Sequence, residues 1–600
     1  MTASPDITPS KLDLSHERPR ALRRLNLVWL WLRGQIRGSA LALILVAALV
    51  GTASGLATLT VSAAARMLQG LLYGLSHSER LSAVPRMSVW ELPILPLGGL
   101  LLGLMTLAWS RRRPRPIVDP VEANALRGGR LSARDSLFVG VQSVLSNGLG
   151  ASVGLEAAYA QLGGWIASFT GVMLNLRRSD LRVFVGAGAG AGIAAAFGAP
   201  LTGAFYAFEI IIGSYSLTNV APVVAAALAG ALVVKLLRVD PLVLHTSVTM
   251  GLRAWHYLLF AGLGVVCALF GVGVMRTVAV IERFAGRLPG PRWLRPALGG
   301  VILAALAFVS PQTLSAGHGA MRMDFYADLA VGTLVWLALS KAAASAIALG
   351  FGFRGGLFFA SLFLGALVGR LFILGLYAAG LPMDVDPLAG SLVGMGAMAV
   401  AIIGGPFTMS FLVLETTGDF GLTAATLTAA IVASVTVRET FGYSFSTWRL
   451  HLRGETIRGA HDVGWLRNLT ANRMLSVGAQ TAPATISAEA FRERFPLGST
   501  RRVIALDETG RYGGILHVPE IHAQDEVTGD IGPFLTHRDQ WLSPQMTIKD
   551  ILKQFAQTET DELAVVDDDR RYIGVLSEAY ATRRYAEELE KARRDLVGAD

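Results

Sequence analysis

The sequence has almost no cysteine and few charged residues. Cys267 is the single cysteine among 600 residues, which excludes an intrachain disulfide and any metal site built from several cysteines. Charged residues make up only 16% of the chain and hydrophobic residues 52%, with a mean hydropathy of +0.49. This composition excludes an ordinary soluble globular protein and predicts a chain that crosses a lipid bilayer several times. Cys267 lies in an apolar run, where we expect it to pack in a core.

The sequence also lacks the residue spacing that is typical of a metal site. The histidines are scattered, and none has the partner ligands that a zinc site needs at short intervals. We therefore expect no metal and no resident cofactor, and we interpret His318 as a loop or interface residue.

The formal net charge of +9 does not indicate nucleic-acid binding, because the basic residues cluster beside apolar segments. Such clusters mark the cytoplasmic ends of membrane helices. The N-terminal tail is too long and polar for a cleaved signal peptide, and it predicts a cytoplasmic N-terminus. Its basic residues before the first apolar run are Arg18, Arg20, Arg23, Arg24, Arg33 and Arg37.

Apolar runs recur from about residue 38 to residue 449, and the last 150 or so residues return to a soluble composition. We predict a cytoplasmic N-terminal segment (1–36), a transmembrane domain (37–453), a linker with a first soluble module (454–530), and a second module with a C-terminal helix (531–600). Short β-rich runs such as VIALD and ELAVVDD alternate with apolar helix patterns in the soluble part, which is typical of two β-α-β modules in tandem.

Many apolar segments between residues 137 and 236, and again after residue 329, are shorter than the roughly 20 residues of a simple span. Glycine and proline interrupt them in both regions. Broken helices at membrane depth are tolerated only in protein or beside an aqueous cavity, and they mark substrate sites in duplicated transporters. We therefore predict an inverted repeat with a site formed by its broken helices.

Glu156 lies in the stretch GLEAAYAQLGG, where a small-residue turn opens an apolar helix. A carboxylate at membrane depth is a candidate functional group, because it needs water, a partner or an ion beside it. The alternative is a local one, in which the acidic group in the first helical turn is favoured by the helix dipole. Residue type alone leaves these two interpretations balanced.

Several of these stretches together resemble the CLC family of chloride channels and proton-coupled chloride transporters, over about residues 38–453. The family motif G-[RK]-E-G-P-x-x-x-x-G-G carries a glutamate that blocks the anion path, and the resemblance makes Glu156 this gate. The segment F-N-A-P-L-A-G is similar to residues 197–203, and V-L-E-[ML]-T to part of FLVLETTGDF. The signature G-G-[IL]-F-x-P is matched by residues 355–358.

The resemblance implies an anion site built from two helix-start loops, a tyrosine hydroxyl and a further backbone N–H. Its residues are Gly154, Leu155, Gly356, Leu357, Phe358, Phe359, Tyr443 and Ile117. Amide N–H groups and a hydroxyl can hold an anion without adding a full positive charge.

The sequence departs from the family at several positions. Ile117 stands where the family motif G-S-G-I-P has a serine that coordinates chloride, so the coordinating hydroxyl is missing. Ile210 stands where the exchangers have a second, proton-carrying glutamate, with Glu209 one residue earlier and about 100° away on a helix. An alternative proton path would use Glu209, Asp119 or Glu122. For Glu209 a hydrogen bond at a helix end is at least as good an interpretation.

The soluble modules resemble tandem cystathionine-β-synthase (CBS) domains. Nucleotide-binding examples end in G-h-[ST]-x-x-D, and residues 574–580 and 514–520 follow this pattern incompletely, with His517 in place of the hydroxyl residue. A structural or dimerising role is the better interpretation, and an adenine nucleotide at these modules is the weaker alternative.

The sequence thus predicts an all-α polytopic membrane protein of the CLC type, an inverted repeat of broken helices, with a C-terminal α/β tandem CBS region. We expect a homodimer in a bacterial inner membrane, with both termini cytoplasmic, that moves chloride or a related anion and is not an enzyme. Channel-like conduction is slightly preferred because of Ile210, and proton/chloride antiport is the alternative. A carrier of another solute and a membrane-embedded enzyme are less favoured, since neither predicts the ordered motifs.

Overall fold

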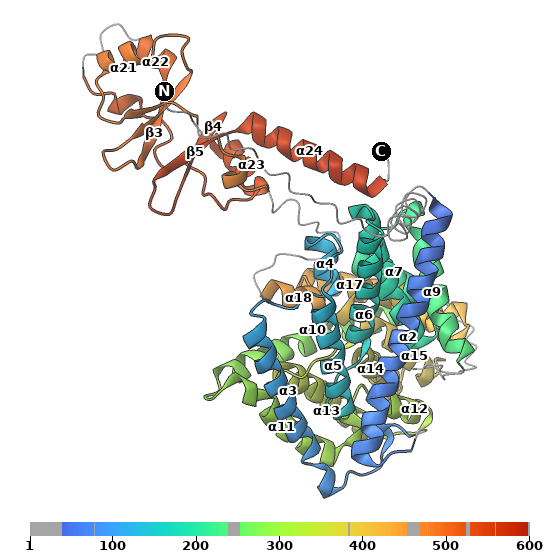
Figure 1. Cartoon of the computed structure of the whole chain (residues 1–600). Coiled ribbons are helices and arrows are strands. Elements are labelled where there is room, and N and C mark those ends of the chain that lie inside the picture. Colours follow the sequence, from blue (N-terminus) through green and yellow to red (C-terminus); the bar gives the residue numbers. More distant parts are fainter. Residues whose placement is uncertain are drawn as a thin grey trace, which may run out of the picture. The chain divides into compact units, whose positions relative to one another are not determined.

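The computed structural model describes residues 39–76, 79–237, 253–381, 384–452, 469–476, 478–523, 529–558 and 560–597. The chain divides into two compact units, Met1–Ala460 and His461–Asp600, which we describe separately (Figure 1). The predicted N-terminal segment, 1–36, lies outside the described residues.

The first half of the membrane unit alternates long helices with short ones. Its elements are α2 (Ala40–Tyr73), η1 (Leu81–Ala83), η2 (Val89–Glu91), α3 (Ile94–Arg112), α4 (Pro120–Leu126), α5 (Ala133–Gly148), α6 (Glu156–Met173), α7 (Arg178–Phe197), α8 (Pro200–Tyr206), the π-helical turn η3 (Ala207–Ile212) and α9 (Leu217–Leu236).

The second half repeats this alternation. Its elements are α10 (Ala254–Arg287), η4 (Arg292–Leu294), α11 (Arg295–Val309), η5 (Pro311–Thr313), α12 (His318–Tyr326), α13 (Val331–Gly350), α14 (Phe358–Ala378), α15 (Pro387–Ile403), α16 (Pro406–Thr417), α17 (Phe420–Thr440) and α18 (Phe445–Leu452).

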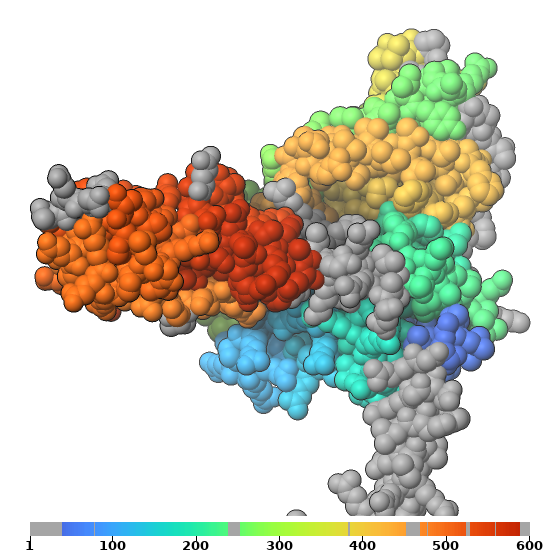
Figure 2. All heavy atoms as spheres, turned by 90° about the horizontal axis from the view of Figure 1, so that it is seen from above, coloured from blue at the N-terminus to red at the C-terminus, as the bar shows by residue number. Residues whose placement is uncertain are grey.

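The packing of the two halves is duplicated. Helix α2 packs on α9, α6 on α7 and α7 on α9, and the equivalent pairs α10 with α17, α14 with α15 and α15 with α17 pack in the second half. Figure 2 shows the two halves side by side, blue to teal against green to yellow-orange. Helices α3 and α11, and likewise α8 and α16, contact each other across the two halves. The predicted duplication is therefore present.

Within the described residues, nine helices are long and apolar enough to cross a membrane. Helix α2 leaves Leu41, Leu45 and Leu49 more than half exposed, and α3 does the same with Leu97. Exposed leucines along long helices are expected where lipid replaces water as the surrounding solvent. The shorter apolar helices, Pro200–Ile212 and Pro387–Ile403, are buried within the unit or cross only part of it.

Small residues allow the inner helices to approach closely. A Cβ added at Gly163 of α6 would overlap the backbone oxygen of Gly188 in α7, and a Cβ at Gly188 would overlap the oxygen of Gly163. Helices in lipid associate through close backbone approach at small residues, because lipid tails are as apolar as the side chains and the hydrophobic effect does not drive the helices together. Cys267 is fully buried on α10, which confirms its predicted packing role.

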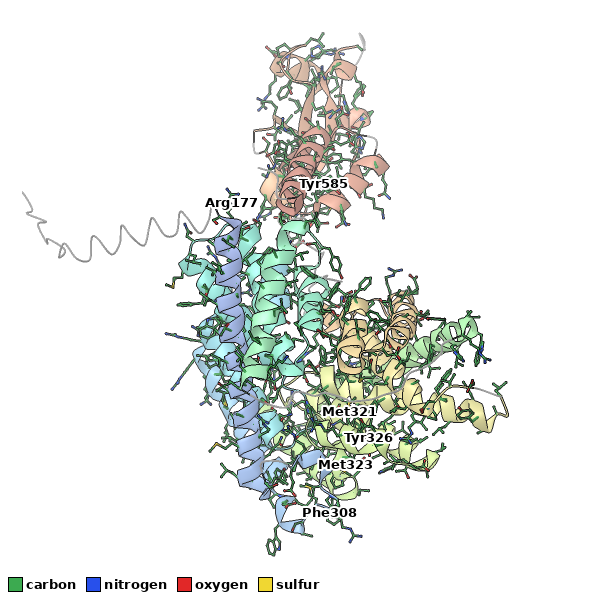
Figure 3. All side chains as sticks on the ribbon, turned by 90° about the vertical axis from the view of Figure 1, so that its right-hand side faces the viewer. Arg177, Phe308, Met321, Met323, Tyr326 and Tyr585 are labelled. Carbon is green, nitrogen blue, oxygen red and sulfur yellow. The ribbon has the colours of Figure 1, made fainter. Side chains whose placement is uncertain are left out.

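Helix α12 has two different faces. Met321 is completely buried, whereas Met323 and Tyr326 are 46% and 62% exposed (Figure 3). His318 is the first residue of this helix and stacks on Phe359, with ring centroids 3.6 Å apart. The interpretation of His318 as a loop or interface residue is therefore wrong: it packs against the start of α14.

The C-terminal unit contains two small sheets. The strands are β1 (Thr481–Pro483), β2 (Arg502–Leu506), β3 (Tyr512–His517), β4 (Glu562–Val566) and β5 (Tyr572–Ser577). The helices are α20 (Ala471–Met474), α21 (Ala488–Arg494), α22 (Val518–His522), η6 (Gly532–Phe534), α23 (Ile548–Thr558) and α24 (Glu578–Val597). The first sheet has the order β1-β2-β3, with β1 parallel to β2, and the second pairs β4 with β5.

The two hairpins of this unit are copies of each other. Strands β2 and β3 pair antiparallel with a register shift after Ala505, and β4 and β5 do so with a shift after Val565. The turns also pair with each other, because the N–H of Tyr512 donates to the oxygen of Arg570 at 2.9 Å and that of Tyr572 to Gly510 at 3.3 Å. The predicted tandem modules thus form one body around two joined hairpins.

Candidate functional site

The starts of α6 and α14 are tied together by their backbones. The N–H of Gly154 donates to the oxygen of Gly356 at 2.9 Å, and the N–H of Gly356 returns a bond to the oxygen of Gly154 at 3.2 Å. These loops come from opposite halves of the repeat, so the pair brings two helix N-termini to one place. The first N–H groups of a helix lack partners within it and carry partial positive charge.

Glu156 lies inside this junction. It is the first residue of α6 and is only 4% exposed. Its Oε2 has no hydrogen-bond partner among the described residues, and a Cβ added at Gly154 would overlap this oxygen. The backbone N–H groups of Glu156 itself and of Phe359 face the carboxylate. An acid that only stabilises the first turn of a helix needs neither burial nor an unpaired oxygen. The local interpretation therefore does not account for the position of Glu156.

The start of α14 supplies the remaining predicted donors. The first helical bond there runs from the N–H of Ser361 to the oxygen of Leu357 at 2.7 Å, which leaves the N–H groups of Phe358 and Phe359 ahead of it. Gly154 and Gly356 were predicted as anion-binding residues, but the N–H group of each donates to the carbonyl oxygen of the other. They therefore clamp the two helix starts, and the helical N–H groups that remain ahead of the first bond of α14 belong to Phe358, Phe359 and Ala360.

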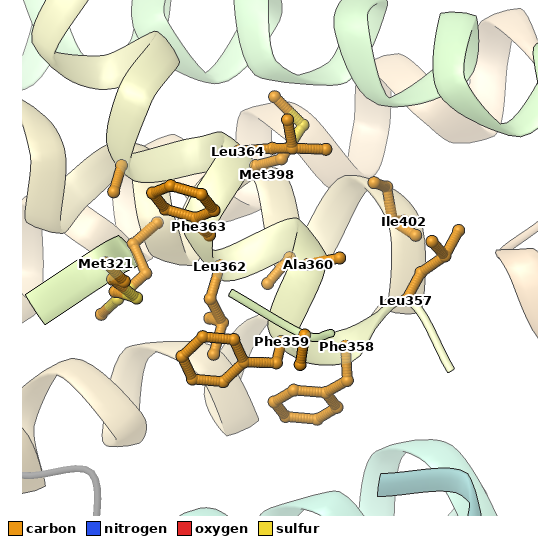
Figure 4. Close-up of a cluster of buried hydrophobic side chains, with 14 of the residues drawn as sticks. Met321, Leu357, Phe358, Phe359, Ala360, Leu362, Phe363, Leu364, Met398 and Ile402 are labelled. Carbon is orange, nitrogen blue, oxygen red and sulfur yellow. The ribbon is translucent and has the colours of Figure 1, made fainter. Parts of the chain in front are cut away.

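A buried hydrophobic cluster holds this helix start. Leu357, Phe358 and Phe359 are each at most 3% exposed, and they lie in one cluster with Ile402 of α15 and Met321 of α12 (Figure 4). Such packing fixes the direction of the first N–H groups of α14, so the donors are positioned before any ligand arrives.

Leu155 is the residue before α6 and is 6% exposed. The segment with Ile117 is joined to the same helix, because Gln161 Nε2 donates to the oxygen of Val118 at 3.0 Å and to Ser136 Oγ at 3.0 Å. Ile117 itself is half-buried. The contacts of Gln161 thus connect the helix that carries the candidate gate to the segment before α4.

The two carboxylates near α4 have local partners. Asp119 caps α4 by accepting the N–H of Glu122 at 2.8 Å. Glu122 is buried and accepts from Arg127 Nη2 at 3.1 Å. These contacts give both residues a structural role, and their place on a proton path stays a prediction.

Glu209 caps a helix of the other half. Its carboxylate accepts the N–H of Phe407 at 3.1 Å, the N–H of Thr408 at 2.8 Å and the Thr408 hydroxyl at 2.6 Å. This is the helix-end interpretation that the sequence left open. Ile210 beside it touches glycine backbone, with its Cδ1 3.6 Å from where a Cβ of Gly404 would lie.

Glu415 makes the reciprocal contact. It accepts the N–H of Leu201 at 2.7 Å, the N–H of Thr202 at 2.8 Å and the Thr202 hydroxyl at 2.7 Å. The motif P-x-T-x-x-F-x-x-x-E occurs at both places, Pro200–Glu209 and Pro406–Glu415, and this repeat is the sequence signal that would have revealed the contact. Each half caps the other by the same atoms, as a local two-fold relation requires.

Tyr443 packs among aromatic residues near α18. Its hydroxyl lies 3.2 Å from His451 Nδ1, and its ring stacks on His451 with centroids 4.5 Å apart and lies 5.5 Å from Trp448. The role of Tyr443 as an anion ligand stays a prediction, since the contacts above belong to α18.

Lys341 is a buried charge that the sequence reasoning overlooked. It is 1% exposed on α13, and its Nζ donates to the backbone oxygens of Thr313 at 3.1 Å and Ser315 at 2.7 Å. A lysine within an apolar helix was itself the signal. It fixes the loop before α12, whose first residue, His318, packs on Phe359.

Broken helices that meet at a buried carboxylate in a duplicated helical unit define a class of polytopic membrane transport proteins. The sequence comparisons identify the family. Residues 108–438 match the family model described as voltage gated chloride channel, and residues 530–587 match the CBS domain model. The chain belongs to the voltage gated chloride channel (CLC) family, with C-terminal CBS domains. Members of this family are channels or transporters rather than enzymes.

Curated relatives cover the membrane unit. A putative chloride channel protein, ClcB-like, from Ralstonia nicotianae is 30% identical over 404 residues, covering 66% of this chain and 93% of the relative. The voltage-gated ClC-type chloride channel ClcB of Escherichia coli (strain K12) is 28% identical over 403 residues, covering 66% and 95%.

Solved structures share the fold. A slow cyanobacterial Cl⁻/H⁺ antiporter has a TM-score of 0.60 at 22% identity and covers 68% of this chain and 97% of its own. A eukaryotic CLC transporter has a TM-score of 0.57 at 19% identity and covers 92% and 98%. The predicted all-α fold with a CBS region is therefore confirmed.

Proposed function

We propose that this protein moves chloride or a related anion across a membrane through a pathway gated by Glu156. The observation that carries the proposal is the buried Glu156 carboxylate at the joined starts of α6 and α14. When it is ionised, the carboxylate competes with an anion for the same N–H donors. When it is protonated or displaced, those donors become available.

We propose channel-like conduction rather than proton/chloride antiport. An exchanger needs a second acid that takes up protons from the cytoplasm. Here Glu209 accepts three hydrogen bonds at the start of α16, and its neighbour Ile210 cannot carry a proton. The relatives and structures named above include both channels and antiporters, so antiport is the second candidate.

The test reconstitutes the full chain in liposomes and records chloride and proton movement together. The expected result is chloride flux down its gradient without uphill proton movement. Chloride flux that drives protons uphill would show that the protein is an antiporter rather than a channel. No anion flux at any pH between about 3.5 and 8, an interval that brackets the ordinary carboxyl and histidine pKa values of about 4 to 6.5, would overturn anion transport itself.

Three further parts of the proposal concern the protein's setting. We propose a homodimer in the bacterial inner membrane with both termini in the cytoplasm, supported by the basic clusters beside apolar segments.

For the CBS modules we propose a structural role. The joined hairpin turns support this, because their backbone hydrogen bonds hold the modules together. Adenine-nucleotide binding is the weaker alternative, tested by equilibrium dialysis of ATP against the full chain.

A further inference from the structure

Tyr206 lies beside the site, at a position that the motif P-x-T-x-x-F-x-x-x-E leaves unspecified. It is the last residue of α8, where the chain passes into the π-helical turn η3. Its ring centroid lies 6.2 Å from that of Phe358, and Phe197 approaches the same Phe358 ring to 5.1 Å. Tyr206 therefore touches the residue whose N–H is one of the free donors at the start of α14.

The side chain extends from this point toward α4. Tyr206 packs against the cluster of Leu155 and Phe358, and also against a smaller cluster that contains Val121 of α4. The charged groups near enough to act on Tyr206 electrostatically are Asp119, at the cap of α4, and Glu156, at the start of α6. Tyr206 therefore packs at once against the cluster that contains the start of α14 and against the cluster that contains Val121 of α4.

The Tyr206 hydroxyl has no hydrogen-bond partner among the described residues. The side chain is only partly exposed, and its oxygen is not among the sealed polar atoms without partners, so it keeps accessible surface within the unit. Interior tyrosine hydroxyls normally find a partner. The unpaired Tyr206 hydroxyl, on a side chain that packs against Phe358, lacks a partner that an anion would supply.

We propose that the Tyr206 hydroxyl donates a hydrogen bond to the permeating anion on the α4 side of Glu156. It would supply the hydroxyl donor that the resemblance assigns to a serine and that Ile117 cannot provide. This inference rests on the proposed function, since it presupposes an anion in the pathway. The Asp119 carboxylate on the same side has a local partner in the Glu122 N–H, and a neutral O–H donor holds the anion without further charge.

The test is Tyr206→Phe in the full chain, reconstituted in liposomes. The substitution removes the hydroxyl and keeps the ring on Phe358. The initial rate of chloride flux is measured against chloride concentration. Because a hydrogen bond to a charged group contributes about 1.5–3 kcal/mol, we expect the half-saturating chloride concentration to rise at least about tenfold. Thermal unfolding of the purified variant should match that of the unaltered chain.

Tyr377→Phe is the matched control. Tyr377 lies on the same helix as Phe358 but near its other end, and its hydroxyl donates to the oxygen of Val385 at 2.7 Å. We expect wild-type chloride dependence from it. An unchanged half-saturating concentration in Tyr206→Phe, with flux intact in the unaltered chain, would overturn this inference alone. No anion flux in the unaltered chain would overturn the inference and the proposed function together.

Discussion

Gly154 and Gly356 exchange two backbone hydrogen bonds, at 2.9 and 3.2 Å, across the two halves of the membrane unit. The pair fixes the first turns of α6 and α14 against each other and leaves room for the Glu156 carboxylate only because Gly154 has no side chain. The candidate gate and the N–H donors beside it are thus held by backbone contacts, which substitutions elsewhere on these loops do not remove.

The two glycines should respond differently to alanine. A Cβ at Gly154 would overlap Glu156 Oε2, whereas a Cβ at Gly356 would lie 3.7 Å from its nearest neighbours, among them this same oxygen. Overpacking costs about 1–3 kcal/mol, which lowers the population of the seated carboxylate roughly 5- to 150-fold. Gly154→Ala should therefore raise chloride flux at neutral pH, measured in liposomes, while Gly356→Ala should behave like the unaltered chain. Equal effects of both would contradict this geometry.

Neutralising the gate should remove the pH response of transport. Raising the pH ionises Glu156, and the carboxylate then competes with chloride for the N–H groups at the start of α14. Flux through the unaltered chain should accordingly rise as the pH falls, and Glu156→Gln should carry high flux at both acid and neutral pH. Glu439→Gln, on the exposed end of α17, is the control and should keep the wild-type profile. If the Glu156→Gln protein kept the pH profile of the unaltered chain, Glu156 would not be the gate.

The reciprocal caps should contribute equally to stability. Glu209 and Glu415 each accept two backbone N–H groups and a threonine hydroxyl. Replacing a helix-capping acceptor costs about 0.5–2 kcal/mol, so Glu209→Gln and Glu415→Gln should lower the thermal midpoint in detergent by similar amounts. If Glu209 instead carried protons, Glu209→Gln alone would alter proton flux and leave the midpoint unchanged.

The first hairpin of the C-terminal unit should weaken in acid. The N–H groups of Arg511 and Thr509 and the Thr509 hydroxyl donate to Asp507, and they hold the pKa of this carboxyl below its ordinary value. A lowered folded-state pKa stabilises the fold above the ordinary pKa, and the contribution is lost as the pH falls through the folded value. Asp507→Asn should speed hydrogen exchange of the β2 and β3 amides at neutral pH, and the difference from the unaltered chain should shrink in acid. A difference that persists in acid would contradict this assignment.

Much of the architecture follows from the sequence. Low charge and long apolar runs predict the membrane unit, and interrupted helices predict the duplication, because both are local properties of the chain. The cap of α4 is local in the same way, because Asp119 and Pro120 stand next to each other at the start of this helix. His318 was misplaced, because its stacking on Phe359 joins residues distant in the sequence.

The sequence by itself determined the membrane class, the tandem soluble modules and the candidacy of Glu156, since each rests on residue types and short-range spacing. Only the tertiary structure decided the capping role of Glu209, the clamp between Gly154 and Gly356, and the packing of Tyr206 against Phe358 and the cluster of Val121. All three features depend on contacts between residues that are far apart in the sequence. Residue types and spacing cannot predict them, because neither a backbone hydrogen bond nor an unpaired hydroxyl requires a particular sequence pattern.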